Sequence, residues 1–167
     1  MRVDAAAGGF GDGDGRRSYD DRVNESACVF CSIVRGETAA HFVFDEGEAG
    51  TCAAFLDQRP LFKGHVLLVP RTHYATLTDL PAEMVGPLFV HAQRLAGAMQ
   101  SVLDAAGSFV ALNNKISQSV AHLHVHVVPR NPKDGLKGFF WPRTKYDDDA
   151  EMAGYATRLA EGLRQSP

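Results

Sequence analysis

Three histidines alternate with aliphatic residues in HLHVHVV, residues 122–128. In an extended strand, every second side chain lies on the same face, about 6.6 Å from the last. We therefore expect His122, His124 and His126 to project together, with the aliphatic residues facing a core. A neutral imidazole whose second nitrogen is held by an acceptor is a nucleophile near pH 7. Alternate histidines can also ligate a catalytic zinc ion, and an exposed face could carry them by chance.

Two cysteines, Cys28 and Cys31, have the C-x-x-C spacing. This spacing is typical of redox-active pairs, but the βαβ pattern of thioredoxin-like motifs is missing around it. The two thiols could also pack in a core, or form half of a structural zinc site. Such a site needs two more ligands, usually histidines. The candidates are His41, His73, His91 and His122.

The elements that position these groups follow from the hydrophobic pattern. Five segments have the length and composition of strands: 41–44, 51–56, 65–70, 108–112 and 120–128. A short helix is expected in CVFCSIVRGE, and a helix is expected to close the chain after DDD. The long helix has Asp79 as its expected N-cap, and Pro87 should bend it or mark its beginning. The sequence predicts an α+β fold with a five-stranded, mainly antiparallel sheet.

Composition limits the class of protein. With 167 residues and 45% hydrophobic content, the chain suits one domain with a sizeable core, over residues 26–167 with an extension from about 132. Residues 1–25 are rich in Gly and Asp and are expected to form a flexible tail. The net charge of −3 favours neither nucleic acid nor a membrane as partner. An odd cysteine count without a signal-like segment indicates a cytoplasmic protein, with Cys52 as a core residue.

Several ordered motifs resemble those of the histidine-triad (HIT) superfamily of nucleotide hydrolases and transferases. They are CVFCSIVRGE, FLDQRP, GHVLLVPRTH, NNKISQSV and HLHVHVVPR, and together they span residues 28–131. The resemblance implies the HIT-like fold. It also implies a covalent mechanism, in which a histidine attacks the α-phosphorus of a nucleotide and water then resolves the nucleotidyl-histidine.

Roles for individual residues follow from this resemblance. His124 matches the nucleophile, and His126 matches the histidine that contacts a phosphate oxygen. His65, in GHVLLVP, matches a further histidine at the phosphate. Ser119 matches the residue that hydrogen-bonds the leaving group, and Gln118 beside it is expected to contact phosphate.

The resemblance also implies a nucleoside pocket. Asp57 matches the residue that binds both ribose hydroxyls, through charge-assisted hydrogen bonds. Asn113 matches an asparagine on the phosphate side, although the loop NNKIS is shorter than the Gly-rich loop of many members. The apolar residues implied to contact the base are Val29, Phe30, Ile33, Phe55 and Leu56.

The zinc-bearing HIT branches, and the related galactose-1-phosphate uridylyltransferases, suggest a use for the cysteines. Their ligand pattern maps here onto Cys28, Cys31, His73 and His122. The zinc implied is structural: it would hold the first helix against the histidine strand and leave His124 and His126 free. No organic cofactor is implied.

The expected protein is a homodimeric enzyme that acts on dinucleoside polyphosphates such as diadenosine polyphosphates. Three alternatives remain open: a nucleoside phosphoramidase, a zinc-stabilised nucleotide-binding module without turnover, and a metal-dependent hydrolase. The segment GLKGFFWPRTKY, residues 135–146, could stack on a second base or seal the sheet or the dimer interface. Its aromatic and cationic residues are Lys137, Phe139, Phe140, Trp141, Arg143 and Lys145.

Overall fold

The structure is a computed structural model that describes residues 27–136 and 145–165. The chain divides into two compact units, Met1–Pro132 and Lys133–Pro167. The expected tail, residues 1–25, and the Phe139–Trp141 aromatic cluster lie outside the described residues. Within the described part, no helix combines the length and the apolar character that a membrane span requires.

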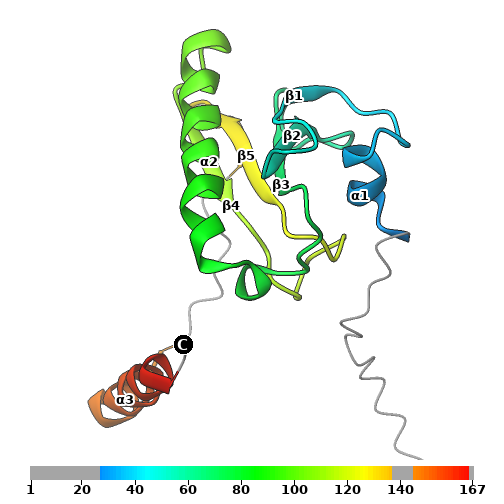
Figure 1. Ribbon diagram of the computed structural model, residues 1–167. Coiled ribbons are helices and arrows are strands. Elements are labelled where there is room, and N and C mark those ends of the chain that lie inside the picture. The colour runs from blue at the N-terminus through cyan, green and yellow to red at the C-terminus, as the bar shows by residue number, and fades with distance from the viewer. Residues whose placement is uncertain (1–26, 137–144, 166–167) are drawn as a thin grey trace, which may run out of the picture. The chain divides into compact units, whose positions relative to one another are not determined.

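The first unit is built on a five-stranded antiparallel sheet (Figure 1). Its strands are β1 (Phe42–Asp45), β2 (Cys52–Leu56), β3 (Val66–Pro70), β4 (Gly107–Ala111) and β5 (Val125–Arg130). They lie in the order β1-β2-β3-β5-β4. In register, Ala54 pairs with Leu68, which in turn pairs with Val125. The strands predicted for the first four segments are confirmed to within one residue at either end.

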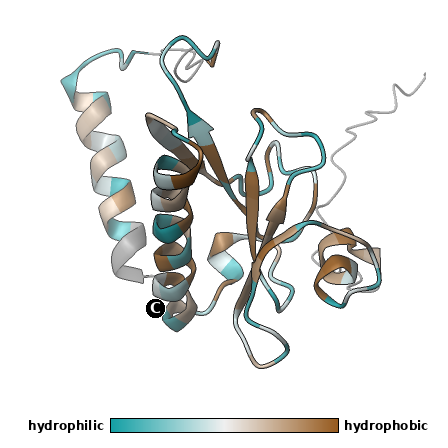
Figure 2. Ribbon diagram, turned by 90° about the horizontal axis from the view of Figure 1, so that it is seen from above, coloured by the Kyte–Doolittle hydropathy of each residue, from teal (hydrophilic) through white to brown (hydrophobic). Residues whose placement is uncertain are grey.

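A helix packs on each face of this sheet. The 21-residue helix α2 (Ala82–Val102) covers one face, and the six-residue helix α1 (Val29–Val34) lies against the other (Figures 1 and 2). Gly36 has φ +77°, a conformation that suits glycine just beyond the end of α1. Pro87 lies inside α2 and so does not mark its beginning.

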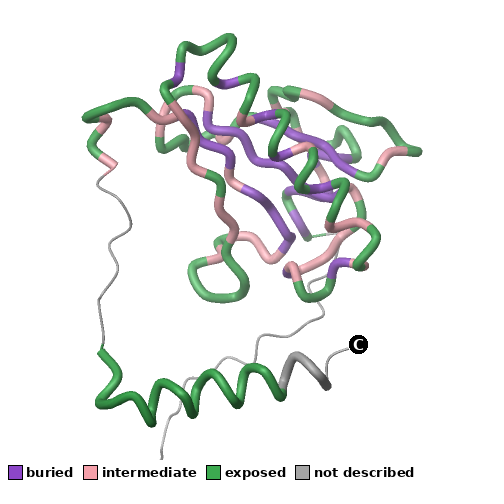
Figure 3. The backbone as a smooth tube through the Cα atoms, turned by 90° about the vertical axis from the view of Figure 1, so that its left-hand side faces the viewer, coloured by how far each residue is buried: buried purple, intermediate pink, exposed green. Residues whose placement is uncertain are grey.

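Strict alternation of side chains gives the sheet two hydrophobic cores. Cys52, Leu68 and Val127 face α2, whereas Phe55, Leu67 and Val69 face α1. Figure 3 shows the buried backbone concentrated in the central strands β2, β3 and β5, while the edge strands β1 and β4 are more exposed. This alternation places the histidine side chains on the α1 face.

Two predicted boundaries were wrong. β5 begins at Val125 rather than at residue 120, because the backbone N–H of Leu123 donates to the carbonyl of Tyr74 (2.6 Å) instead of continuing the ladder. The N-cap of α2 is Pro81 rather than Asp79. Asp79 instead accepts from the backbone and hydroxyl of Thr76, in the capping box of a 3-10 helix, η2 (Leu77–Asp79).

The second unit contains α3 (Asp149–Gln165), which confirms the predicted C-terminal helix. Its first turn carries Asp149 and Glu151, as the helix dipole favours. Met152, Tyr155 and Leu159 lie at helical spacing on this helix and are exposed. Lys145, ahead of the helix, is also exposed.

Candidate functional site

A cavity of about 540 Å³ lies on the α1 face of the sheet. Two of the triad histidines, His124 and His126, line it, and so do Asp57 and Ser119. All five apolar residues expected at the base also line it: Val29, Phe30, Ile33, Phe55 and Leu56. The structure therefore brings together nine of the twelve predicted catalytic and substrate-binding residues around one space.

The tautomer of His124 is fixed by the backbone. Its Nδ1 lies 2.7 Å from the carbonyl oxygen of His122, which can only accept, so Nδ1 carries the proton. The lone pair then resides on Nε2, the nitrogen left for the cavity. Burial lowers the pKa of His124, against the effect of this hydrogen bond, and keeps the ring neutral. The edge-to-face contact with Phe30, at 5.2 Å between centroids, restrains the ring further.

The ring of His65 forms a hydrogen bond with the ring of His126 and thereby fixes its tautomer. The backbone N–H of Leu61 donates to Nδ1 of His65 (3.2 Å), so the neutral ring carries its proton on Nε2. That nitrogen lies 3.0 Å from Nδ1 of His126 and donates to it. The remaining proton of His126 is therefore on Nε2. Burial, followed by the neighbouring His124 and His65, holds the pKa of His126 at about 4.

This arrangement differs from the expectation that His65 lies at the phosphate. His65 is only 2% exposed and does not line the cavity, whereas His126 does. Burial lowers the pKa of His65, although the carboxylate of Asp57 acts in the opposite direction. Within the described residues, His65 is connected to the cavity through its hydrogen bond to His126.

Asp57 lies at the cavity wall, in a turn that its own side chain stabilises. Its Oδ1 accepts from the backbone N–H of Arg59 (2.8 Å), and Oδ2 lies 3.4 Å from Nδ1 of His65. Because that nitrogen already accepts from Leu61, Asp57 acts on the neutral His65 ring through its charge rather than through a hydrogen bond. The lining position of Asp57 is compatible with binding a ribose.

Gln118 and Asn113 do not line the cavity; their side chains hold the loop before Ser119. The Nε2–H of Gln118 donates to the carbonyl of Ala75 (2.6 Å), and its Oε1 accepts from the N–H of Lys115 (2.8 Å). Asn113 donates from Nδ2 to the carbonyl of Ser117 (3.3 Å).

This loop also contains residues in the left-handed region. Lys115 and Ser117 have φ values of +64° and +60°, which cost energy for residues other than glycine. The amide of Gln118 secures this conformation and thereby sets the position of Ser119 on the cavity wall.

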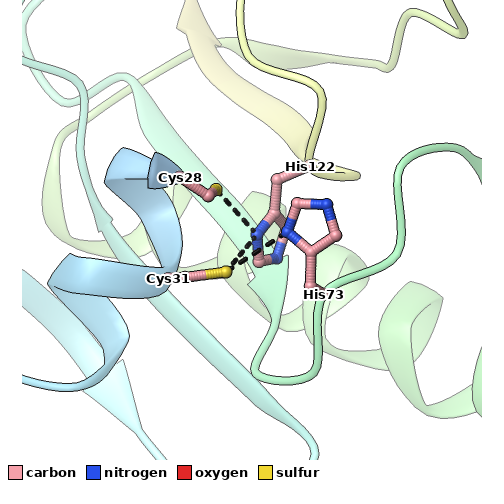
Figure 4. A group of neighbouring side chains, drawn as sticks. All are labelled: Cys28, Cys31, His73 and His122. Atoms are coloured by element: carbon pink, nitrogen blue, oxygen red, sulfur yellow. Dashed lines mark hydrogen bonds between the residues drawn. The ribbon is translucent and has the colours of Figure 1, made fainter. Parts of the chain in front are cut away.

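The four predicted metal ligands converge between α1 and the segment that precedes β5 (Figure 4). Nδ1 of His122 lies 3.5 Å from Sγ of Cys28 and 3.4 Å from Sγ of Cys31. Nδ1 of His73 lies 3.2 Å from Sγ of Cys31. Residues distant in sequence thus present two sulfurs and two nitrogens to one point.

The donor set and its geometry fit a zinc ion. A tetrahedral S₂N₂ site with bonds of about 2.0–2.3 Å has ligand–ligand separations of about 3.3–3.8 Å. The Nε2–H of His122 donates to the carbonyl of Pro70 (2.9 Å), which leaves Nδ1 as the ligand atom. Both cysteine side chains are buried. Two thiolates would neutralise a divalent ion in this buried position.

Some lining residues were missed by the sequence reasoning. They are Ala40, Gln58, Arg59, Leu67 and Val120. Gln58 and Arg59 follow Asp57 directly in FLDQRP, and Val120 follows Ser119, so adjacency to a predicted residue was the available signal. Ala40 precedes β1, and nothing in the local sequence distinguishes it.

The chain is similar to proteins of a known family. The model of the HIT domain family matches residues 35–133. The adenosine 5'-monophosphoramidase HNT1 of Saccharomyces cerevisiae is 38% identical over 127 residues, 75% of this chain and 76% of the yeast protein. The adenylylsulfatase HINT3 of Arabidopsis thaliana is 30% identical over 139 residues, 81% of this chain and 67% of the plant protein.

A solved structure adds the metal to this comparison. The zinc-bound histidine triad family protein of Mycobacterium smegmatis shares 35% identity with a TM-score of 0.63. The similarity covers 84% of this chain and 97% of the mycobacterial chain.

Proposed function

Because this chain belongs to the HIT domain family, we propose that it is a nucleotide hydrolase or nucleotidyl transferase that uses His124 as its nucleophile. The observation that carries this proposal is the hydrogen bond from Nδ1 of His124 to the carbonyl of His122. It leaves a lone pair on Nε2 of a neutral imidazole at the cavity wall, which is what attack on phosphorus requires.

The proposed reaction has two displacements. Nε2 of His124 attacks the α-phosphorus, the phosphorus–leaving-group bond breaks, and its electron pair departs with the leaving group. The Nε2–H of His126 donates to a phosphoryl oxygen, and the hydroxyl of Ser119 stabilises the departing atom. Water then attacks the nucleotidyl-histidine, which releases the nucleotide and restores His124.

The substrates we propose are dinucleoside polyphosphates of the diadenosine type. The apolar lining with Phe30 and Phe55 suits a nucleobase, and Asp57 suits a ribose. A nucleoside phosphoramidase is the second candidate, supported by the activity named for the yeast relative. The plant relative is named for cleavage of an adenylyl sulfate, so the leaving group must be tested directly.

We also propose that Cys28, Cys31, His73 and His122 hold a structural zinc ion. The ion would supply a cross-link between α1 and the segment that carries His124. Those four residues orient the helix that provides Phe30 to the cavity. In this proposal the metal takes no part in the displacements, because the nucleophile and its proton donors are all side chains of the cavity.

Intact-protein mass spectrometry tests the chemistry. The protein is mixed briefly with diadenosine tetraphosphate, an adenosine phosphoramidate or adenylyl sulfate and denatured at alkaline pH, because phosphorus–nitrogen bonds hydrolyse in acid. We expect the wild type to gain one nucleotidyl group and His124→Asn to gain none. Absence of the adduct and of turnover with all three compounds, with nucleotide still bound, would instead establish a binding module.

A further inference from the structure

A second group of side chains of the types that ligate metals lies on the α2 face of the sheet, opposite the cavity. Glu46 follows β1, Cys52 begins β2, and His91 projects from α2. Their ligand atoms all lie within 4.8 Å of one another. None of the three lines the nucleotide cavity or takes part in the Cys28 site.

The carboxylate and the imidazole are already oriented. Oε1 of Glu46 lies 2.8 Å from Nε2 of His91, and the His91 ring stacks on Phe44 at 4.8 Å between centroids. Oε2 of Glu46 accepts from the backbone N–H groups of Thr51 (2.7 Å) and Cys52 (2.9 Å) and from the Thr51 hydroxyl (3.0 Å). The hairpin therefore fixes one carboxylate oxygen and leaves the other directed at His91.

Cys52 supplies the third donor. It is 1% exposed and free, and the hydroxyl of Thr51 approaches its sulfur only weakly, at 3.7 Å. Cys52 also packs in the core beneath α2, and this packing holds its sulfur beside the carboxylate–imidazole pair. A thiolate and a carboxylate together neutralise a divalent cation, which favours binding at a partly buried position.

A fourth coordination position is open to a neighbouring cavity. This cavity of about 380 Å³ is lined by Phe44, Glu46, His91, Arg94, Leu95 and Ala98. Two of the three donors thus face a space that water can enter. Three protein ligands with an open fourth position are typical of zinc sites that also bind water or a substrate, whereas closed structural sites have four protein ligands.

We propose that Glu46, Cys52 and His91 form a second site for a zinc-like divalent cation. On binding, the Cys52 thiol releases its proton to solvent as the metal–sulfur bond forms. The Glu46–His91 hydrogen bond gives way to one bond from each residue to the ion; the proton on Nε2 of His91 is lost to solvent, and Nδ1 takes one up from solvent. Oε1 of Glu46 and Nε2 of His91 then separate from 2.8 Å to about 3.3 Å. Because this site offers one protein ligand fewer than the Cys28 site, it should release its ion to a chelator first.

Metal stoichiometry tests the proposal on the full-length protein. The chain is loaded with zinc chloride, desalted and analysed by elemental mass spectrometry. We expect about two zinc ions per chain in the wild type and one fewer in Cys52→Ala and in His91→Gln. Gln93→Ala, an exposed change on the same helix, is the matched control and should match the wild type. One zinc ion in the wild type, or an unchanged count in both variants, would overturn the proposal.

Cobalt spectroscopy gives a test that does not depend on a variant folding. Cobalt(II) is titrated into the metal-free wild type, and the thiolate-to-cobalt charge-transfer absorption is followed. The first equivalent should report the two thiolates of the Cys28 site. The second should add a weaker band from a single thiolate, and a second equivalent that binds without any such band would overturn the assignment to Cys52.

Discussion

Replacing His65 separates a positioning role from direct contact with the substrate. The ring accepts from the N–H of Leu61 at Nδ1 and donates to His126 from Nε2. Glutamine offers the same pair of groups, because its Oε1 accepts and its Nε2–H donates, at a spacing close to that of the two ring nitrogens. Leucine fills a similar volume but offers neither. His65→Gln should therefore preserve the tautomer of His126, whereas His65→Leu should lose it.

The size of the effect follows from one hydrogen bond. Without a donor, Nδ1 of His126 is left unsatisfied in a partly buried position, which costs about 1–3 kcal/mol. If that energy is lost from the transition state, the rate falls by about 5- to 150-fold, since about 1.4 kcal/mol corresponds to a factor of ten. His65→Gln should stay within about fivefold of the wild type.

The assay is the single-turnover rate of nucleotidyl-histidine formation, measured by rapid quench with diadenosine tetraphosphate. Thermal unfolding of both variants serves as the control for stability. Equal and large losses in His65→Gln and His65→Leu, in folded protein, would refute the reasoning. That result would show that His65 itself meets the phosphate.

Three further predictions concern stability. Cys31→Ser should lower the free energy of unfolding by at least about 3 kcal/mol, or roughly 10 °C in Tm, because it removes a buried ligand of the proposed zinc ion. In the fraction that folds, the rate of adduct formation should change far less. The pKa of His126 is about 6.5 in the unfolded chain, and burial lowers it to about 4 in the folded protein. Between these values the unfolded chain binds one proton more, so the free energy of unfolding should fall by up to about 3 kcal/mol as the pH falls from 6.5 to 4. Denaturant unfolding should show a flatter pH dependence in His126→Gln. Phe30→Ala should cost about 3–5 kcal/mol and weaken nucleotide binding, since this ring is 7% exposed. Val29 lines the same cavity and is 44% exposed, so Val29→Ala should lower the free energy of unfolding by less than about 1 kcal/mol. Calorimetric titration with AMP compares the nucleotide affinities of Phe30→Ala and Val29→Ala.

Much of the fold follows from local pattern. The continuous apolar runs CAAFL and VLLVP predict strands that are buried on both faces, because successive side chains contribute in turn to the α2 core and the α1 core. The two-residue period of a strand likewise predicted that His124 and His126 lie on one face. These are short-range regularities that backbone geometry imposes on any strand or helix.

Other features depend on contacts that the sequence does not display. β5 begins late because the backbone N–H of Leu123 donates to the carbonyl of Tyr74, which is distant in sequence, and not to a neighbouring strand. Gln118 was expected at a phosphate, yet its amide bonds the carbonyl of Ala75. Neither contact can be read from spacing along the chain, because each depends on where a remote loop passes.

His122 serves two neighbours through different parts of one residue. Its imidazole faces the cysteines, while its main-chain oxygen holds the proton of His124. For protein engineering, this separates two effects: a change of the ring acts on the cysteine cluster and on the hydrogen bond to Pro70, whereas the carbonyl acts on His124. A redesigned metal-free variant could fill the space of the ligands with packed apolar groups, provided that the peptide between residues 122 and 123 keeps its present orientation.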